Sequence, residues 1–236
     1  MKKHKPLNLL DNKGFWPEKG AILDGLREVL ALGDCDDPPP VRDFGTYRGV
    51  KWRDENDELV PYQSVDWYVF NAMEEERLQV DARRLLDSFC DEPWREEHMI
   101  GDHYDLFVME EDMFDPDAAD GGAYAVGRAR PYMAAVVSTH RIDHIWGMPY
   151  SYLKTEAMRQ ICAMFGAPGE EREQTREVGS QAFCTNRCIM QHADEAPEDW
   201  QVLTEIRIKE GPFCEACLQE LTEFFAEAEA EKAEQA

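Results

Sequence analysis

Four cysteines in the C-terminal part of the chain constrain its fold more than any other feature of the sequence. They form two close pairs, Cys184-x3-Cys188 and Cys214-x2-Cys217. Two sulfurs on one turn of chain can reach a single ion at about 2.3 Å, and two such pairs complete a tetrahedral site. Buried free thiols are the alternative, but two short spacings in one chain are a rarer pattern than scattered cysteines. The spacing therefore predicts one structural zinc ion held by these four residues.

The charge of the chain bears on its partners. Its 236 residues include 49 Asp and Glu against 25 Lys and Arg, a formal net charge of −24. Such an excess repels phosphate backbones, so we expect no nucleic-acid partner. No apolar run approaches the roughly 18 residues of a membrane span, and the N-terminal segment lacks the apolar stretch of a signal peptide. We therefore expect a cytoplasmic protein without a membrane partner, where paired cysteines indicate metal rather than disulfides.

Hydrophobic periodicity predicts a mixture of helices and strands, which makes this an α+β chain. Apolar residues recur at helical spacing in three segments: 20–32, 62–89 (as one long or two consecutive helices) and 152–165. Two short apolar runs, 104–109 and 134–139, indicate buried strands. We expect the helices to pack on a sheet that contains these strands.

Further segments of the chain complete the expected domain. Ala123 to Arg130 is predicted to be an edge strand, because two glycines precede it and Pro131 follows it. The whole chain, 1–236, is expected to form a single domain. Within it we expect four segments of distinct character: an irregular N-terminal extension with one helix (1–60), an exposed insertion (169–179), the four-cysteine region (184–217) and a frayed helical tail (225–236).

The segment from Tyr104 to Cys217 resembles the archaemetzincin family of zinc metalloproteases. The family has a strand like YDLFV, a Gly-rich loop, a strand like AVVST, a helix, and a cluster of the form C-x4-C-x-M followed by C-x2-C. Here the cluster reads CTNRCIM, ending at Met190, and then CEAC. The first spacing is one residue shorter than in the family and the later interval is longer, and neither departure threatens metal binding. The resemblance implies a zincin- or metzincin-like mixed β-sheet packed with helices, plus a C-terminal four-cysteine zinc knuckle region.

The catalytic motif of that family, HExxHxxGxxH, has no counterpart in this chain. In the family, two histidines one helical turn apart bind zinc together and the glutamate serves as general base. We align Phe165-Gly166 with the aromatic-glycine pair of the family, and the third histidine with the residue before the first cysteine. Arg159 then stands at the position of the first histidine and Gln160 at that of the glutamate. Ala163 and Phe183 stand at the positions of the second and third histidines.

These replacements remove the chemistry of the motif. Arg159 stays protonated near neutral pH, so it cannot ligate a cation and would repel one. Gln160 cannot act as a base, and the side chains of Ala163 and Phe183 offer no lone pairs. Counting from the glycine instead would place the third ligand at Gly169, which is no ligand either. The resemblance therefore predicts a pseudopeptidase, in which Met190 serves only as core packing.

Three functions remain open at this stage. The leading hypothesis is a non-catalytic zinc-binding protein whose former substrate cleft, bordered by the expected edge strand, binds a peptide or a protein. The second is a zinc metallopeptidase with relocated metal ligands, and the third is a purely structural partner subunit. The candidate relocated ligands are His103, His140, His144 and His192. His140 and His144 have i, i+4 spacing, but in an extended segment they would lie about 13 Å apart.

Overall fold

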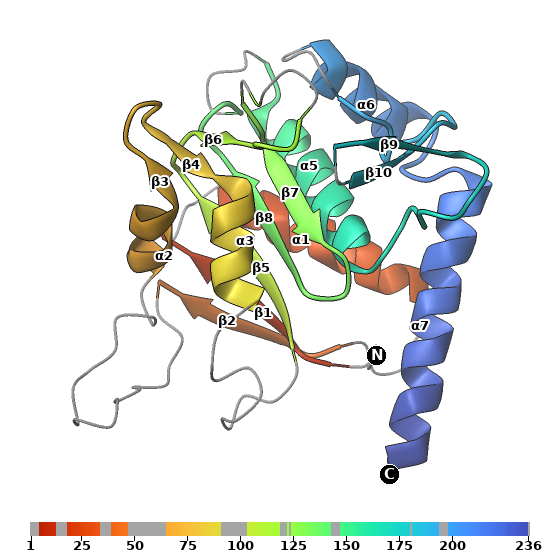
Figure 1. Cartoon of the computed structure of the whole chain (residues 1–236). Helices are drawn as coiled ribbons and strands as arrows, with labels where there is room; N and C mark the ends of the chain where they lie inside the picture. Colours follow the sequence, from red (N-terminus) through yellow and green to blue (C-terminus); the bar gives the residue numbers. More distant parts are fainter. Residues whose placement is uncertain are drawn as a thin grey trace.

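The computed structural model describes residues 5–12, 18–33, 39–46, 65–90, 103–118, 122, 124–142, 147–179, 181–193 and 198–235 (Figure 1). The helices are α1 (Glu18–Leu30), α2 (Val65–Ala72), α3 (Ala82–Cys90), α5 (Pro149–Met164), α6 (Glu198–Lys209) and α7 (Glu215–Gln235), with a 3₁₀ turn over Ala31–Gly33. The strands are β1 (Leu7–Asp11), β2 (Val41–Gly45), β3 (Met73–Glu74), β4 (Gln79–Asp81), β5 (Tyr104–Met109), β6 (Met113–Phe114), β7 (Gly127–Arg130), β8 (Ala134–Ser138), β9 (Thr175–Val178) and β10 (Gln181–Cys184).

A five-stranded sheet in the order β2-β1-β5-β8-β7 forms the centre of the molecule. Its first four strands are parallel, and β7 pairs with β8 in the antiparallel direction at the edge. Every residue of β1, β5 and β8 is buried, as expected of parallel strands that are covered on both faces. The predicted α+β class and the two predicted strands are confirmed. The predicted edge strand is present but shorter than expected, since β7 begins at Gly127, and Ala123 lies outside the described residues.

Alternate residues of the central strands divide the core into two parts. In β5, Leu106 and Val108 join the cluster that includes α1 and α5, whereas Phe107 and Met109 join the cluster that includes α2 and α3. This alternation follows from the two-residue period of a strand. As Figure 1 shows, α1 and α5 therefore cover one face of the sheet and α2 and α3 the other.

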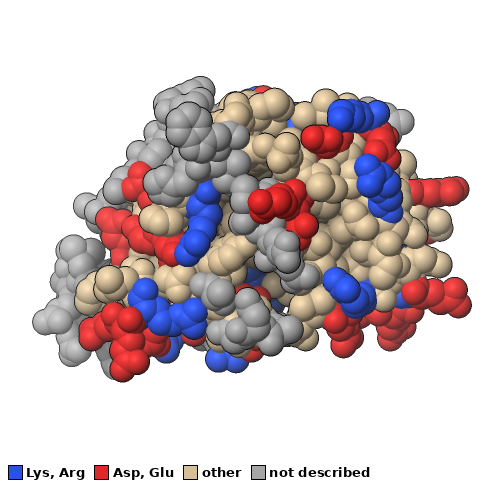
Figure 2. Space-filling view, turned by 90° about the horizontal axis from the view of Figure 1, so that it is seen from above, with Lys and Arg blue, Asp and Glu red and all other residues tan. Residues whose placement is uncertain are grey.

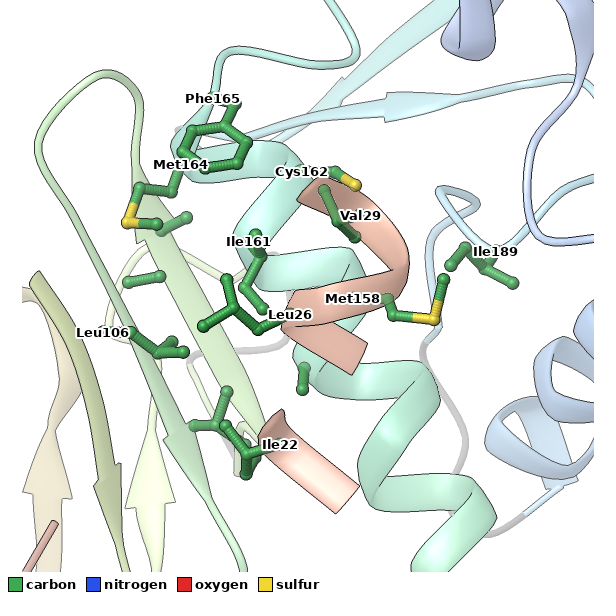
Figure 3. Close-up of a cluster of buried hydrophobic side chains, with 14 of the residues drawn as sticks. Ile22, Leu26, Val29, Leu106, Met158, Ile161, Cys162, Met164, Phe165 and Ile189 are labelled. Carbon is green, nitrogen blue, oxygen red and sulfur yellow. The ribbon is translucent and has the colours of Figure 1, made fainter. Parts of the chain in front are cut away.

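Helix α5 has the buried face that its periodicity predicts. It begins with a proline in its first turn, where the missing N–H costs no helical hydrogen bond, and Gly166 follows its end with a φ of +90°. Figure 3 shows its side chains gathered with Ile22 and Leu26 of α1 against Leu106 of β5. All four residues predicted to form the buried face are buried: Met158, Ile161, Cys162 and Phe165.

The N-terminal segment is not an irregular extension, as the sequence analysis expected. Its strand β1 lies between β2 and β5, and its helix α1 packs against α5. The pattern LNLLD was missed because two of its five residues are polar. Both are buried and have polar partners: Asn8 donates to Asp105 at 3.2 Å, and Asp11 accepts a hydrogen bond from Lys19 at 2.9 Å. Segment 62–89 resolves into two helices, with the strands β3 and β4 between them.

The C-terminal part adds three features. Segment 169–179, expected as an exposed insertion, is exposed or half-buried and contains β9, which pairs with β10. The tail from residue 225, expected to be a frayed helix, is helical through Gln235, and Phe224 just before it stacks on Phe165 with ring centroids 4.8 Å apart. Helix α6 was not predicted. None of the described helices is long and apolar enough to span a membrane.

Candidate functional site

The four cysteines, from two separate stretches of chain, lie together. Cys184 ends β10, Cys188 follows in the next turn, Cys214 directly precedes α7, and Cys217 lies in its first turn. All four sulfurs lie within 4.8 Å of one another, and the Cys184–Cys214 and Cys188–Cys217 sulfur pairs are 3.7 and 3.9 Å apart. A tetrahedron with 2.3 Å metal–sulfur bonds has edges of about 3.8 Å. The positions of the sulfurs therefore fit a tetrahedral zinc ion.

Hydrogen-bond donors surround the sulfurs. Arg172 Nη2 lies 3.1 Å from the sulfur of Cys184 and 3.4 Å from that of Cys217, and its Nη1 is held by Glu220 at 2.8 Å. The backbone N–H of Asn186 also donates to Cys184 at 3.3 Å. Donors of this kind stabilise thiolates and orient metal ligands from outside the coordination sphere. The surroundings thus suit a centre that carries negative charge.

The thiol pKa values show how strongly the sulfurs interact. The pKa of Cys184 is lowered because the thiols of Cys188 and Cys217 donate hydrogen bonds to its thiolate. The pKa of Cys217 is raised because its own thiol donates to Cys184 and Cys188 and because it is buried. The sulfurs therefore lie close enough together to act as one group. Zinc is a soft divalent ion that binds four thiolates in structural sites.

A second site lies between α5, the edge strand β7 and the hairpin of β9 and β10. A cavity of about 370 Å³ there is bordered by Gly127 of β7, by Arg159 and Gln160 of α5, and by Phe183 and His192. The edge strand approaches the helix closely: a Cβ atom on Gly127 would come within 2.5 Å of both Gln160 Cγ and Glu156 Oε1. Only glycine therefore allows β7 to lie at this distance from α5.

Glu156 is the centre of a buried polar network at the floor of this cavity. It is 1% exposed, and it accepts hydrogen bonds from Arg159 Nη1 at 2.5 Å, from Gln160 Nε2 at 2.8 Å and from Trp200 Nε1 at 3.0 Å. Arg159 also donates from Nη2 to the carbonyl oxygen of Gln191 at 2.8 Å. The prediction that Arg159 lies at the cleft beside a carboxylate is confirmed.

The four positions aligned with the catalytic motif lie along this cleft. Arg159, Gln160 and Phe183 border the cavity just described, whereas Ala163 borders an adjoining cavity of about 290 Å³, as does Gly169. Glu156 and Trp200 were missed by the sequence analysis. Glu156 stands three and four residues before Arg159 and Gln160, a helical spacing that could have revealed the network. Trp200 lies on α6, and no sequence pattern near it indicates that it contacts the cleft.

The described candidate histidines lie in separate places. His103 lies just before β5 and is buried, with its Nε2 3.2 Å from the carboxylate of Asp105. His140 lies just after β8 and is exposed, with its Nδ1 3.2 Å from the carbonyl oxygen of Glu110. Since β5 and β8 are parallel, these two lie more than about 15 Å apart, near opposite ends of the sheet. His192 borders the cleft, where its ring contacts Phe183. His144 lies outside the described residues.

Charges on the surface do not form a single basic patch on the face shown in Figure 2. Lys and Arg side chains stand among Asp and Glu side chains over the described part of this face. This agrees with the excess of 49 acidic over 25 basic residues in the chain. It gives no support to binding of a phosphate backbone at this face.

The mixed sheet with its antiparallel edge strand, the helix beneath that strand and the C-terminal four-cysteine cluster define an archaemetzincin-like α+β fold. A solved structure that shares it is archaemetzincin from Methanopyrus kandleri. That structure matches with a TM-score of 0.60 and 21% sequence identity, over 95% of this chain and 97% of the other. No protein-family model matches the sequence, and no curated protein matches it. At this identity the likeness shows the fold, which the sequence resemblance predicted.

Proposed function

We propose that this protein is a non-catalytic, zinc-binding protein of the archaemetzincin fold that binds an extended peptide in the former substrate cleft. One observation carries the proposal. The helix positions that the family uses for a zinc ligand and the general base hold Arg159 and Gln160, which are bound to the buried carboxylate of Glu156. A guanidinium fixed at this place repels a metal cation, and its positive charge is balanced by the protein itself.

The zinc in this proposal is structural. Cys184, Cys188, Cys214 and Cys217 would hold one ion and so join the end of β10 to the start of α7. Four thiolates fill a tetrahedral site and leave no position for water or substrate. The ion supplies a cross-link and charge balance for the sulfurs, while Arg172 and Asn186 orient Cys184 by hydrogen bonds to its sulfur.

The backbone of β7 supports the peptide-binding part of the proposal. Ser138 N–H donates to the carbonyl oxygen of Val126, and Arg128 is paired with Val136 in the same register. In an antiparallel pair, hydrogen-bonded residues alternate, so the N–H and C=O groups of Gly127 and Ala129 point away from β8. Because β7 ends the described sheet, these groups face the cleft side and can pair with an extended peptide.

A buried acceptor in the cleft supports the same conclusion. The Gln160 side chain is 5% exposed, and its Nε2 donates to Glu156, which as a carboxylate only accepts. Its Oε1 is therefore the free end of the amide, and among the described residues it has no hydrogen-bond partner. A buried acceptor without a donor is costly. The N–H of a peptide lying over Gly127 would satisfy it once the Gln160 side chain turns toward the cavity that it borders.

Metal analysis and a binding measurement on the full chain test the proposal together. We expect one zinc ion per chain and no chelator-sensitive cleavage of a fluorescein-labelled decapeptide library, with binding of some of its members detected by anisotropy. In the tightest binder, replacing the peptide N–H groups that pair with β7 by ester oxygens should weaken binding about tenfold per position. Ester replacements outside the paired segment are the control. Failure of every library member to bind would overturn the peptide-binding function.

The alternative of a peptidase with relocated ligands rests on His192, which borders the cleft. It requires a second metal ion per chain and turnover that a chelator abolishes. His192→Ala should then remove both the second ion and the turnover. Under our proposal, His192→Ala leaves the content of one zinc per chain unchanged.

A further inference from the structure

The cleft along β7 continues into a second cavity with a different character. This cavity has a volume of about 290 Å³. It is bordered by Ala129 of β7, by Pro131 and Tyr132, which follow β7, and by the chain that follows α5. Gln181 of β10 borders both cavities, so they lie one after the other along the edge strand. A peptide paired with Gly127 and Ala129 would place the side chain of a neighbouring residue at the second cavity.

Much of the wall of the second cavity is apolar, and the charged residues that border it are all negative. Ala129, Ala163, Ala167 and Pro168 supply apolar surface, while the exposed residues Glu170 and Glu171 supply two carboxylates. No Lys, Arg or His is among the described residues that border it. Arg172, the next residue in the chain, donates instead to Glu220 and to the cysteine sulfurs.

We infer that the cleft selects extended peptides that carry a lysine or arginine, whose side chain enters this second cavity. Lys and Arg bury an aliphatic stem along apolar surface and keep a cationic head in polar surroundings. The alanine and proline walls match the stem, and Glu170 and Glu171 stand where the head would emerge. The inference rests on the proposed function, since it names the class of peptide that the same cleft binds.

Two features of the first cavity suit the extended part of this occupant. The backbone groups of Gly127 and Ala129 that point away from β8 can pair with an extended chain, and Gln160 Oε1 is a buried acceptor without a hydrogen-bond partner among the described residues. The excess of carboxylates at one end of the cleft then fixes the sign of the charge that this chain carries. An acidic side chain at this position would face two carboxylates, and no described Lys, Arg or His borders the cavity.

The test uses the full, zinc-loaded protein and three fluorescein-labelled decapeptides of alternating Thr and Val. They differ only at one central position, which is Lys, norleucine or Glu. In fluorescence anisotropy at about 150 mM salt, where charges beyond about 8 Å are screened, we expect the Lys peptide to bind at least tenfold more tightly than the norleucine peptide. The Glu peptide should bind more weakly than either. In the Glu170→Lys/Glu171→Lys variant, the order of the Lys and Glu peptides should reverse.

A matched variant separates the cavity from the overall charge. Glu223→Lys/Glu229→Lys makes the same change of charge at exposed positions of α7, and it should leave the ratio of affinities unchanged. Equal binding of the three peptides, or an equal loss of preference in both double variants, would overturn the selectivity and leave the proposed function standing. If none of the three peptides and no member of the library binds, the proposed function itself fails.

Discussion

Arg172 beside the cysteine cluster and Arg159 in the cleft are both paired with a glutamate, Glu220 in one case and Glu156 in the other. Arg172 lies outside its site, where it donates to two sulfurs and leaves the space between the four sulfurs to a cation. Arg159 lies within its site, where its own guanidinium meets the buried carboxylate. The same kind of ion pair therefore occurs in two sites with different charge balance. In the cluster, the sulfurs need a bound cation to balance their charge, whereas in the cleft the guanidinium of Arg159 balances the carboxylate of Glu156.

The largest expected effect comes from breaking the cluster. Cys217→Ser should abolish stoichiometric zinc binding and lower Tm by at least about 10 °C, because a structural zinc site contributes its binding energy to folding. Zinc content by elemental analysis and thermal unfolding measure this. Cys162→Ala, a buried cysteine outside the cluster, is the control and should keep its zinc ion. Native Tm and full zinc content in Cys217→Ser would contradict the structural site.

The second effect comes from breaking the charge balance in the cleft. Glu156→Leu leaves the guanidinium of Arg159 buried without a carboxylate, which should cost about 3–5 kcal/mol in the free energy of unfolding. Glu156→Gln/Arg159→Met removes both charges and keeps an acceptor for Trp200, so it should cost much less. Urea unfolding of the zinc-loaded proteins compares the two. If the double variant is as unstable as Glu156→Leu, the charge balance does not explain the network.

The two regions also differ in how far their residues could be predicted from the sequence. The cysteine pairs are local patterns, because zinc ligands must lie on one turn, and the buried face of α5 follows from helical periodicity over four turns. The network in the cleft combines local and distant partners. Glu156 and Arg159 are one turn apart, but Trp200 is brought 44 residues along the chain to the same carboxylate. Such a contact exists only in the folded molecule.

Errors in the predicted fold have the same origin. Strand β1 has five residues and two polar positions, so its alternation was too short to recognise, and its burial depends on partners nearly 100 residues away in β5. The tail after residue 225 has the composition of a solvated helix. At its start, Phe224 and Phe225 pack against Phe165 at the end of α5. Tertiary contacts decided both segments.

Replacing Arg172 should have a smaller effect on zinc binding than replacing a cysteine. The comparison separates the metal ligands from the residues that hydrogen-bond to them. Arg172→Met removes the hydrogen bonds to Cys184 and Cys217 but none of the four sulfurs. Zinc affinity, measured by competition with a chromogenic chelator, should fall about 10- to 100-fold while the content stays at one ion per chain. Arg187→Met, which breaks an exposed ion pair with Glu210, is the matched control and should leave the affinity unchanged. An unchanged affinity in Arg172→Met would show that these hydrogen bonds do not tune the cluster.

The smallest expected effect is the most informative about the cleft. Four single variants each restore one residue of the aligned motif: Arg159→His, Gln160→Glu, Ala163→His and Phe183→His. Peptidase activity should remain undetectable in each of them. The three ligands and the general base act as a unit. A variant that restores one of these four residues still lacks the other three, so it holds no catalytic metal. Arg159→His in addition leaves Glu156 without its guanidinium and should lose stability, whereas Ala163→His faces the second cavity and should not. The assay is cleavage of the decapeptide library with added zinc, on protein whose cluster is already filled. Turnover in any single variant would mean that the remaining ligands are already present in the cleft, and the contrast between a cation-dependent cluster and a self-balanced cleft would then be wrong.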